Sequence, residues 1–332
     1  MTITTPYAIE VAGLTKRYKD FLAVDNLSFS VKKAEVFALL GPNGAGKTTT
    51  VEIINTIRKP TSGHVTLLGM DVTQKKYDII PRIGVLPQGF SSFDRITVSE
   101  TLEYYSRLFG GRKTDIKGLI ALVNLNHKAN EQYRNLSGGL KQRLGIAVAL
   151  VNDPEIVFLD EPTTGLDPRA RREVWEVILD LKKKGKTVFL TTHYMEEAEV
   201  LADTVAIIAK GRITAMGSPE ELIENNVDYF TLTLTMDKKM DKNIVENMAG
   251  IIRKMGFEPV PKIQEATHGD TCGSVQIHLE NPKDVRRILN AVNDGGASFM
   301  SLNIRKPNLE EVFLKLTDEP LREDLSSSRE TP

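Results

Sequence analysis

The chain of 332 residues has very little cysteine and almost no net charge. Its single cysteine, Cys272, can form no internal disulfide, which is typical of a protein from a reducing compartment. We interpret Cys272 as a small strand or loop residue rather than a nucleophile. The 43 Lys and Arg residues against 44 Asp and Glu residues give a net charge of -1, so no strong basic field favours nucleic acid as a partner.

Long apolar runs are also missing. Nowhere do about 18 consecutive apolar residues occur, which is the minimum for a membrane-spanning helix. Runs such as residues 205–209 have the length of a buried strand. The N-terminal segment MTITTPYAIE has neither the basic nor the apolar region of a signal peptide. We therefore expect a chain that does not cross a membrane by itself but can bind to one through a partner.

Between residues 8 and 217 the sequence alternates short apolar strands with longer helical patterns, which favours an α/β core. Early strands are predicted at 9–11 and 27–31, and a more helical, polar region at about 88–150. A helix from about 169 to 184 is predicted between two further apolar strands. The composition changes at Gly217-Ser218-Pro219, so a first domain is expected to cover residues 1–224.

The rest of the chain predicts a smaller domain over residues 225–317. Phe230, Leu232 and Leu234 alternate with threonines, as in a half-buried strand. The patterns that follow predict the order β-α-β-β-α-β, which indicates a ferredoxin-like α+β domain. The segment 318–332 is rich in Ser, Glu, Arg and Pro and is expected to be disordered.

Residues 41–48 read GPNGAGKT, a complete GxxxxGKT phosphate-binding loop between an apolar strand and a helix predicted over 49–57. Glycine lets the backbone curl until successive N–H groups surround an anion, and the following helix directs its positive end there. Lys47 would reach the outer phosphates, and the Thr48 hydroxyl would hold Mg²⁺. The loop therefore predicts a site for a nucleoside triphosphate with Mg²⁺. Its candidate contacts are Gly41, Pro42, Asn43, Gly44, Ala45, Gly46, Lys47, Thr48 and Thr49.

The apolar run 156–159 ends in two adjacent carboxylates. Successive side chains of a strand point to opposite faces, so the two acids can take different roles. Asp160 fits a magnesium partner, directly or through water, and Glu161 fits a general base for the attacking water. Alternatively, both acids cap the turn at 162–165, but the phosphate loop upstream favours the first interpretation.

A second candidate anion site is the segment LSGG at residues 136–139. Ser137, Gly138 and Gly139 precede a helical pattern over 144–150, so they indicate another helix N-terminus that can hold phosphate. One nucleotide needs only one such cradle, which suggests that the second covers the nucleotide of another subunit. The alternative is an ordinary serine-capped helix start.

With these motifs in this order, residues 8–218 resemble the ATP-binding subunit of an ABC transporter. The resemblance implies a P-loop NTPase cassette with a RecA-like core, an antiparallel β subdomain and a helical subdomain. It also implies roles for four further residues. Gln88 would be the Q-loop glutamine near catalysis and Mg²⁺, Asp167 the D-loop aspartate, and His193 the switch histidine. Tyr18 would stack on adenine.

Residues 191–199 and 306–317 resemble the switch segment and the C-terminal signature of ABC-2 exporter ATPases, the branch of daunorubicin-resistance and bacitracin-export ATPases. This resemblance implies that two copies, or one copy and a paralogous subunit, close around two ATP molecules. They would drive a separate multi-span permease at the cytoplasmic face of the membrane, with no nucleic acid partner. The permease would bind near 88–95, where Phe90 and Phe93 are either partner contacts or subdomain core.

Two other functions are considered. A soluble ABC ATPase acting on the ribosome or nucleic acid usually fuses two cassettes, whereas this chain has one phosphate loop and one LSGG segment. A nucleotide-binding regulator without catalysis would not need Glu161 and His193. Leu140 stands where many ABC ATPases carry glutamine, and we expect this change to have little effect on phosphate binding.

Overall fold

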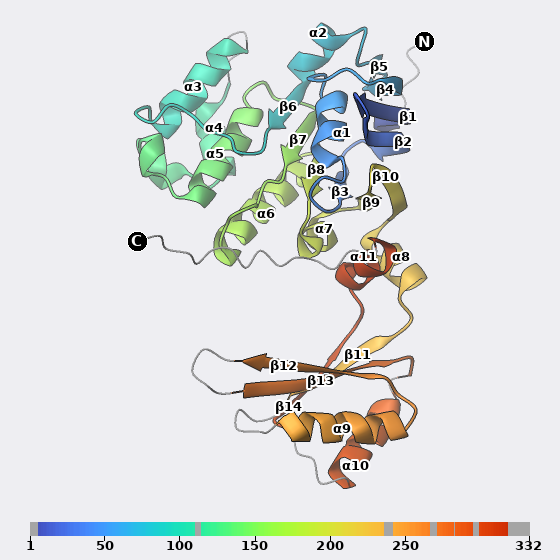
Figure 1. Ribbon diagram of the computed structural model, residues 1–332. Coiled ribbons are helices and arrows are strands. Elements are labelled where there is room, and N and C mark those ends of the chain that lie inside the picture. The colour runs from blue at the N-terminus through green and yellow to red at the C-terminus, as the bar shows by residue number, and fades with distance from the viewer. Residues whose placement is uncertain are drawn as a thin grey trace. The chain divides into compact units, whose positions relative to one another are not determined.

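The computed structural model describes residues 6–109, 114–235, 242–265, 271–281, 283–294 and 299–317 (Figure 1). They form two compact units. The first consists of the described residues up to 222 together with 313–317, and the second consists of the described residues in 223–312. The predicted disordered tail, 318–332, lies outside the described residues.

A six-stranded sheet with the order β10-β9-β3-β8-β7-β6 forms the centre of the first unit. Neighbouring strands are parallel from β9 to β6, and β10 is antiparallel to β9. Strands β3 and β7 are buried at every position, which explains their uninterrupted apolar sequences. The bounds are β3 Val36–Leu40, β6 Ile83–Leu86, β7 Ile156–Asp160, β8 Thr187–Thr192, β9 Thr204–Ala209 and β10 Arg212–Gly217.

A second, antiparallel sheet of the same unit has the order β2-β1-β4-β5. Its strands are β1 Tyr7–Tyr18, β2 Phe21–Lys32, β4 Ser62–Leu67 and β5 Met70–Asp71. The stacked rings of Phe29, Phe37 and Phe189 connect the cores of the two sheets. Strands β1 and β2 are much longer than predicted from the sequence, because register shifts along their pairing interrupt the regular alternation of apolar residues.

Helix α1 follows β3 through the phosphate loop, and α3, α4 and α5 form the predicted helical region (Figure 1). Helix α1 ends three residues earlier than predicted, and Thr56 soon after it has a left-handed backbone with φ of 70°. Helix α5 starts at Gly138, earlier than its apolar pattern, with Ser137 at the N-cap position. The bounds are α1 Lys47–Ile54, α2 Lys76–Ile79, α3 Val98–Leu108, α4 Ile116–Leu122, α5 Gly138–Ala149, α6 Pro168–Lys183, α7 Met195–Leu201, α8 Pro219–Asn226 and α11 Leu309–Thr317.

The second unit has the predicted β-α-β-β-α-β order, and its antiparallel sheet has the strand order β12-β13-β11-β14. The ferredoxin-like prediction is therefore confirmed. Buried Leu232 and Ile277 of the sheet pack in one cluster with Met248 and Ile288 of the helices. Cys272 lies in strand β13. The bounds are β11 Phe230–Thr235, α9 Lys242–Lys254, β12 Pro259–Glu265, β13 Thr271–Leu279, α10 Asp284–Asp294 and β14 Ser301–Arg305.

Among the helices of the described ranges, none is both long enough and apolar enough to span a bilayer.

Candidate active site

The phosphate loop lies where the sequence predicted it, between buried β3 and α1. Close packing explains two of its glycines. A Cβ at Gly41 would collide with the backbone of Ile208, and one at Gly46, where φ is 104°, would lie 2.5 Å from the carbonyl oxygen of Ala23. The loop borders a cavity of about 410 Å³. Its lining residues are Phe21, Ala23, Asn43, Gly44, Gly46, Lys47, Thr48, Thr49, Gln88 and Glu161.

The ammonium group of Lys47 is satisfied by the protein itself. It donates hydrogen bonds to the carbonyl oxygens of Gly41 and Pro42 at 2.8 and 3.2 Å, and it lies 3.3 Å from Glu161 Oε1. Burial lowers the pKa of Lys47, while the charge of Glu161 opposes that shift. The carboxylate of Glu161 therefore holds Lys47 at the phosphate loop, in a position that a triphosphate could take instead.

Four side chains converge on the carboxylate of Glu161. Besides Lys47, Gln88 Nε2 and Thr164 Oγ1 each donate to Glu161 Oε2 at 3.1 Å, and His193 Nδ1 lies 3.4 Å from the same oxygen. The backbone of Glu161 has φ of 48°, a left-handed conformation that is rare for a residue with a side chain. Strain held in place by several contacts is typical of functional sites.

The same neighbours set the charge state of Glu161. Hydrogen bonding by His193 and then the charge of Lys47 lower its pKa to about 2, against burial, which raises it. These contacts hold Glu161 in its ionised form in this arrangement.

Asp160 lies beside this group in a more buried environment. Burial raises its pKa, while hydrogen bonds from Thr191, to Oδ1 at 2.5 Å, and from Thr48 lower it. Thr191 also binds the neighbouring residue, because its Oγ1 accepts a hydrogen bond of 3.0 Å from the backbone N–H of Glu161. The structure therefore brings Thr48 and Asp160 together, as the sequence predicted for two magnesium partners. Hydroxyl and carboxylate oxygens are ligands that suit Mg²⁺.

Ser137, Gly138 and Gly139 lie at the N-terminus of α5, outside the lining of the phosphate cavity. Ser137 and Gly138 are exposed, and the Ser137 side chain makes no capping hydrogen bond. Gly139 is buried against α6, where a Cβ would lie 2.7 Å from Ala170 Cβ. Asp167 caps α6 by accepting hydrogen bonds from the backbone of Arg169 and Ala170 at 3.0 and 2.9 Å. This cradle is open to solvent in the single chain.

Two neighbours of the site were not predicted from the sequence. Glu197 is completely buried, and its Oε1 accepts from Thr163 Oγ1 at 2.9 Å and from Trp175 Nε1 at 3.0 Å. It thereby connects the loop after β7, helix α6 and the segment after His193. Because these residues are distant in sequence, no local pattern predicts the contacts. Phe21 lines the phosphate cavity, whereas the predicted adenine contact Tyr18 is absent from that lining. In the sequence, the only signal for Phe21 is that it is an aromatic residue three positions after Tyr18.

Comparisons with known proteins agree with this geometry. Residues 24–164 match the family described as ABC transporter. The chain is 39% identical to Nod factor export ATP-binding protein I of Rhizobium meliloti, over 95% of this chain and 90% of that protein. It is 37% identical to the protein of the same name from Ralstonia nicotianae, over 95% of each.

Solved structures of ABC transporter cassettes have the same fold. One ATP-binding cassette in its ADP conformation is 26% identical, with a TM-score of 0.61 over 67% of this chain and 95% of that one. A dimeric cassette in a post-hydrolysis state with ADP and Pi is also 26% identical, with a TM-score of 0.58 over 63% and 98%. The predicted P-loop cassette is therefore confirmed. This chain is an ATPase that belongs to the family of ABC transporter ATP-binding subunits.

Proposed function

We propose that this chain is the motor subunit of an ABC-2-type exporter and binds a multi-span permease at the cytoplasmic face of the membrane. The observation that carries the proposal is the group of Lys47, Glu161, Gln88 and His193 at the phosphate loop. A hydrolytic base held next to the phosphate-binding lysine fits a motor better than a passive regulator. The similarity to export ATP-binding proteins along 95% of the chain supports export as the task.

ATP binding begins with an exchange of partners in this proposal. The triphosphate replaces Glu161 beside Lys47, and the N–H groups of the loop surround its outer phosphates. Thr48 and Asp160, with Gln88 nearby, would hold Mg²⁺, which neutralises charge on the phosphates when bound. Glu161, released from Lys47 and lying next to Gln88, then orients the attacking water and accepts its proton. His193, whose Nδ1 lies 3.4 Å from Glu161 Oε2, would contact the γ-phosphate.

A second chain completes each site. The exposed N-terminus of α5, with Ser137 and Gly138, provides backbone N–H groups and a hydroxyl without a capping partner. Such a helix end attracts a γ-phosphate. We therefore expect two chains, or one chain and a paralogous subunit, to close head-to-tail around two ATP molecules. Hydrolysis removes the γ-phosphate, so the attraction ends and the dimer opens.

Ser137→Arg is expected to abolish ATP-dependent dimerisation without weakening ATP binding by the single chain. The large side chain would occupy the exposed cradle, which is separate from the phosphate cavity of its own chain. The measurement is size-exclusion chromatography with ATP in a Glu161→Gln background, alongside an ATP titration. Leu140→Gln, on the same helix, serves as a control that should dimerise. A Ser137→Arg protein that dimerises like the background would contradict the shared site.

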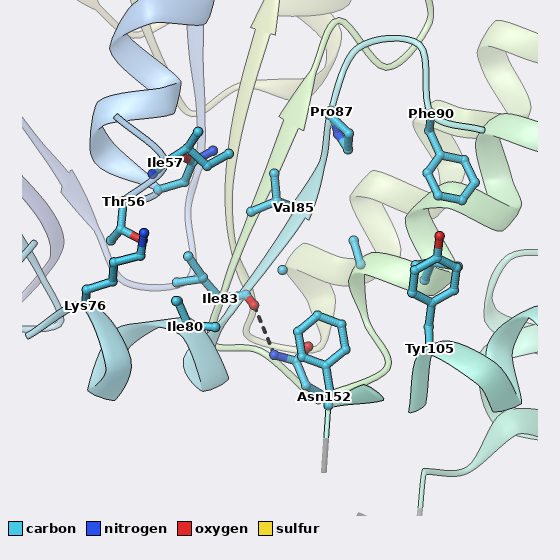
Figure 2. Close-up of a pocket in the computed structure, with 15 residues that line it drawn as sticks. Thr56, Ile57, Lys76, Ile80, Ile83, Val85, Pro87, Phe90, Tyr105 and Asn152 are labelled. Atoms are coloured by element: carbon cyan, nitrogen blue, oxygen red, sulfur yellow. Dashed lines mark hydrogen bonds between the residues drawn. The ribbon is translucent and has the colours of Figure 1, made fainter. Parts of the chain in front are cut away.

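The permease is proposed to bind at an apolar cavity of about 380 Å³ between the core and the helical region (Figure 2). Ile57, Ile83 and Val85 line it from the core, and Phe90 and Tyr105 line it from the other side. The Phe90 ring also contacts Tyr105 and packs near Gly145, so it is both a cavity residue and part of the subdomain core.

Phe93 differs from Phe90, because it is 56% exposed and contacts the Tyr104 ring edge-on at 5.4 Å. Its exposed ring extends the apolar surface of this region. An apolar cavity with exposed aromatic side chains beside it suits a short amphipathic segment of a membrane protein.

Ile57→Glu should keep ATP binding and ATPase activity but lose the copurifying permease. Ile57 is 62% exposed at the edge of the cavity, so glutamate costs the fold little but places a charge in the proposed interface. The assay is affinity purification from detergent-solubilised native membranes, with detection of multi-span proteins. Val200→Glu, at an exposed position outside the cavity lining, is the control. Recovery of ribosomes or RNA in place of a membrane protein would overturn the proposed function.

A further inference from the structure

Glu197 of helix α7 is a buried carboxylate to which the proposed mechanism gives no role. Its side chain is completely buried, and it follows His193 by four positions. Burial raises the pKa of Glu197, while hydrogen bonds from its neighbours and the charge of Arg171 lower it. An apolar side chain would fill the same space without the cost of removing a carboxyl group from water. The contacts of this carboxyl group are therefore the feature that needs a function.

One oxygen of Glu197 receives two hydrogen bonds from different parts of the chain. Thr163 Oγ1 donates to Glu197 Oε1 at 2.9 Å, and Trp175 Nε1 donates to the same oxygen at 3.0 Å. Thr163 is also completely buried and follows Glu161 by two positions in the loop after β7. Trp175 lies within α6. Glu197 therefore holds the loop of the proposed base on one side and a helix without reacting groups on the other.

Helix α6 supports the segment between His193 and Glu197 at a second point. Helices α6 and α7 contact each other (Figure 1), and Arg171 lies four residues before Trp175, on the same face of α6. The Arg171 guanidinium lies 4.3 Å from the centroid of the Tyr194 ring, which in turn lies 4.1 Å from the centroid of the His193 ring. The start of this segment is therefore held against α6 without any contribution from Glu197.

We propose that Glu197 is a positioning residue, which fixes the loop of Glu161 against the segment of His193 through its hydrogen bond with Thr163. The inference rests on the role of Glu161 as the base proposed above. Glu161 has a left-handed backbone with φ of 48°, and such a conformation persists only where its surroundings hold it. Without the bond from Thr163 the loop can relax, and a displacement of about 1 Å at a reacting group can lower a rate by about 10²-fold.

The test removes the two hydrogen bonds of Glu197 Oε1 one at a time, in Thr163→Val and in Trp175→Phe, and measures steady-state ATP hydrolysis by the full chain. Thr163→Val should lower kcat about tenfold and leave the KM for ATP unchanged, because it displaces the base but not the phosphate loop. Trp175→Phe should keep the parental kcat, since Arg171 still holds the segment against α6. Trp175→Phe also removes part of a buried ring, so its midpoint of thermal unfolding should be the lower of the two.

A purely structural role for Glu197 predicts the reverse order, with the less stable variant also the less active. Parental kcat in Thr163→Val, or an equal loss of kcat in both variants, therefore overturns the inference.

Glu197→Gln provides a second test, because glutamine keeps an oxygen that accepts both hydrogen bonds. It should retain the parental kcat, and a loss as large as that of Thr163→Val would overturn the inference by assigning the effect to the negative charge. Failure of the proposed base is a separate result. It would appear as parental turnover in Glu161→Gln, in a chain where Glu197 and Thr163 are unchanged.

Discussion

Glu161→Gln should bind ATP at least as tightly as the parent while its turnover falls by about 10²- to 10⁴-fold, the range for loss of a general base. Glutamine keeps the shape of the side chain and can still accept the hydrogen bond from Gln88, but it cannot take a proton from water. It also removes the negative charge 3.3 Å from Lys47. The triphosphate then no longer competes with a carboxylate for that lysine.

Steady-state phosphate release measures the fall in turnover, and an ATP titration measures the affinity. Glu155→Gln is the matched control, because Glu155 precedes the same strand, is exposed and pairs with Arg82 far from the phosphate cavity. The control should hydrolyse ATP at the parental rate. If Glu161→Gln does so too, Glu161 is not the base, whatever the effect on binding.

Lys47→Ala should weaken ATP binding by about 10- to 100-fold, the usual cost of losing hydrogen bonds to a charged group. The variant leaves the outer phosphates with backbone N–H groups but without the ammonium charge. It also removes the Lys47 charge that lowers the pKa of Glu161, so that pKa should move upwards. Both effects follow from the loss of one ammonium group.

Equilibrium titration with a fluorescent ATP analogue measures the affinity of Lys47→Ala. Lys183→Ala is the control, because Lys183 is exposed at the end of α6 and pairs with Asp180. Parental affinity in Lys47→Ala would show that the loop does not hold the triphosphate in the way proposed. Loss of affinity in both variants would indicate a general charge effect instead.

The phosphate loop and the carboxylates of β7 could be predicted because their signals are local. Residues 41–48 are contiguous, and the strand before them is apolar at every position, so spacing alone indicates the cradle. The ferredoxin-like order of the second unit could also be predicted, since the alternation of apolar residues in β11 and their helical spacing in α9 involve residues close in sequence. The ends of helices and strands were harder to predict. Helix α1 ends before its apolar pattern does, at a position decided by the left-handed backbone of Thr56.

The contacts around the base could not be predicted from residues alone. Gln88 and Glu161 are 73 positions apart, and Thr163 and Glu197 are 34 apart, so only the fold brings each pair together. Family resemblance indicated Gln88 and His193, but nothing indicated Glu197, which is an ordinary acidic residue on a helical pattern. Phe21 was missed for a similar reason, since its position depends on how β2 packs against the loop.

The left-handed backbone of Glu161 lowers the conformational stability of the folded chain. A side chain in that conformation costs of order 1–3 kcal/mol, and glycine would relieve it. Glu161→Gly would release this strain but would leave the buried ammonium group of Lys47 without the carboxylate that lies 3.3 Å from it. The contacts of the Glu161 carboxylate therefore offset the strain of its own backbone, so any event that separates it from Lys47 also removes what holds residue 161 in this conformation.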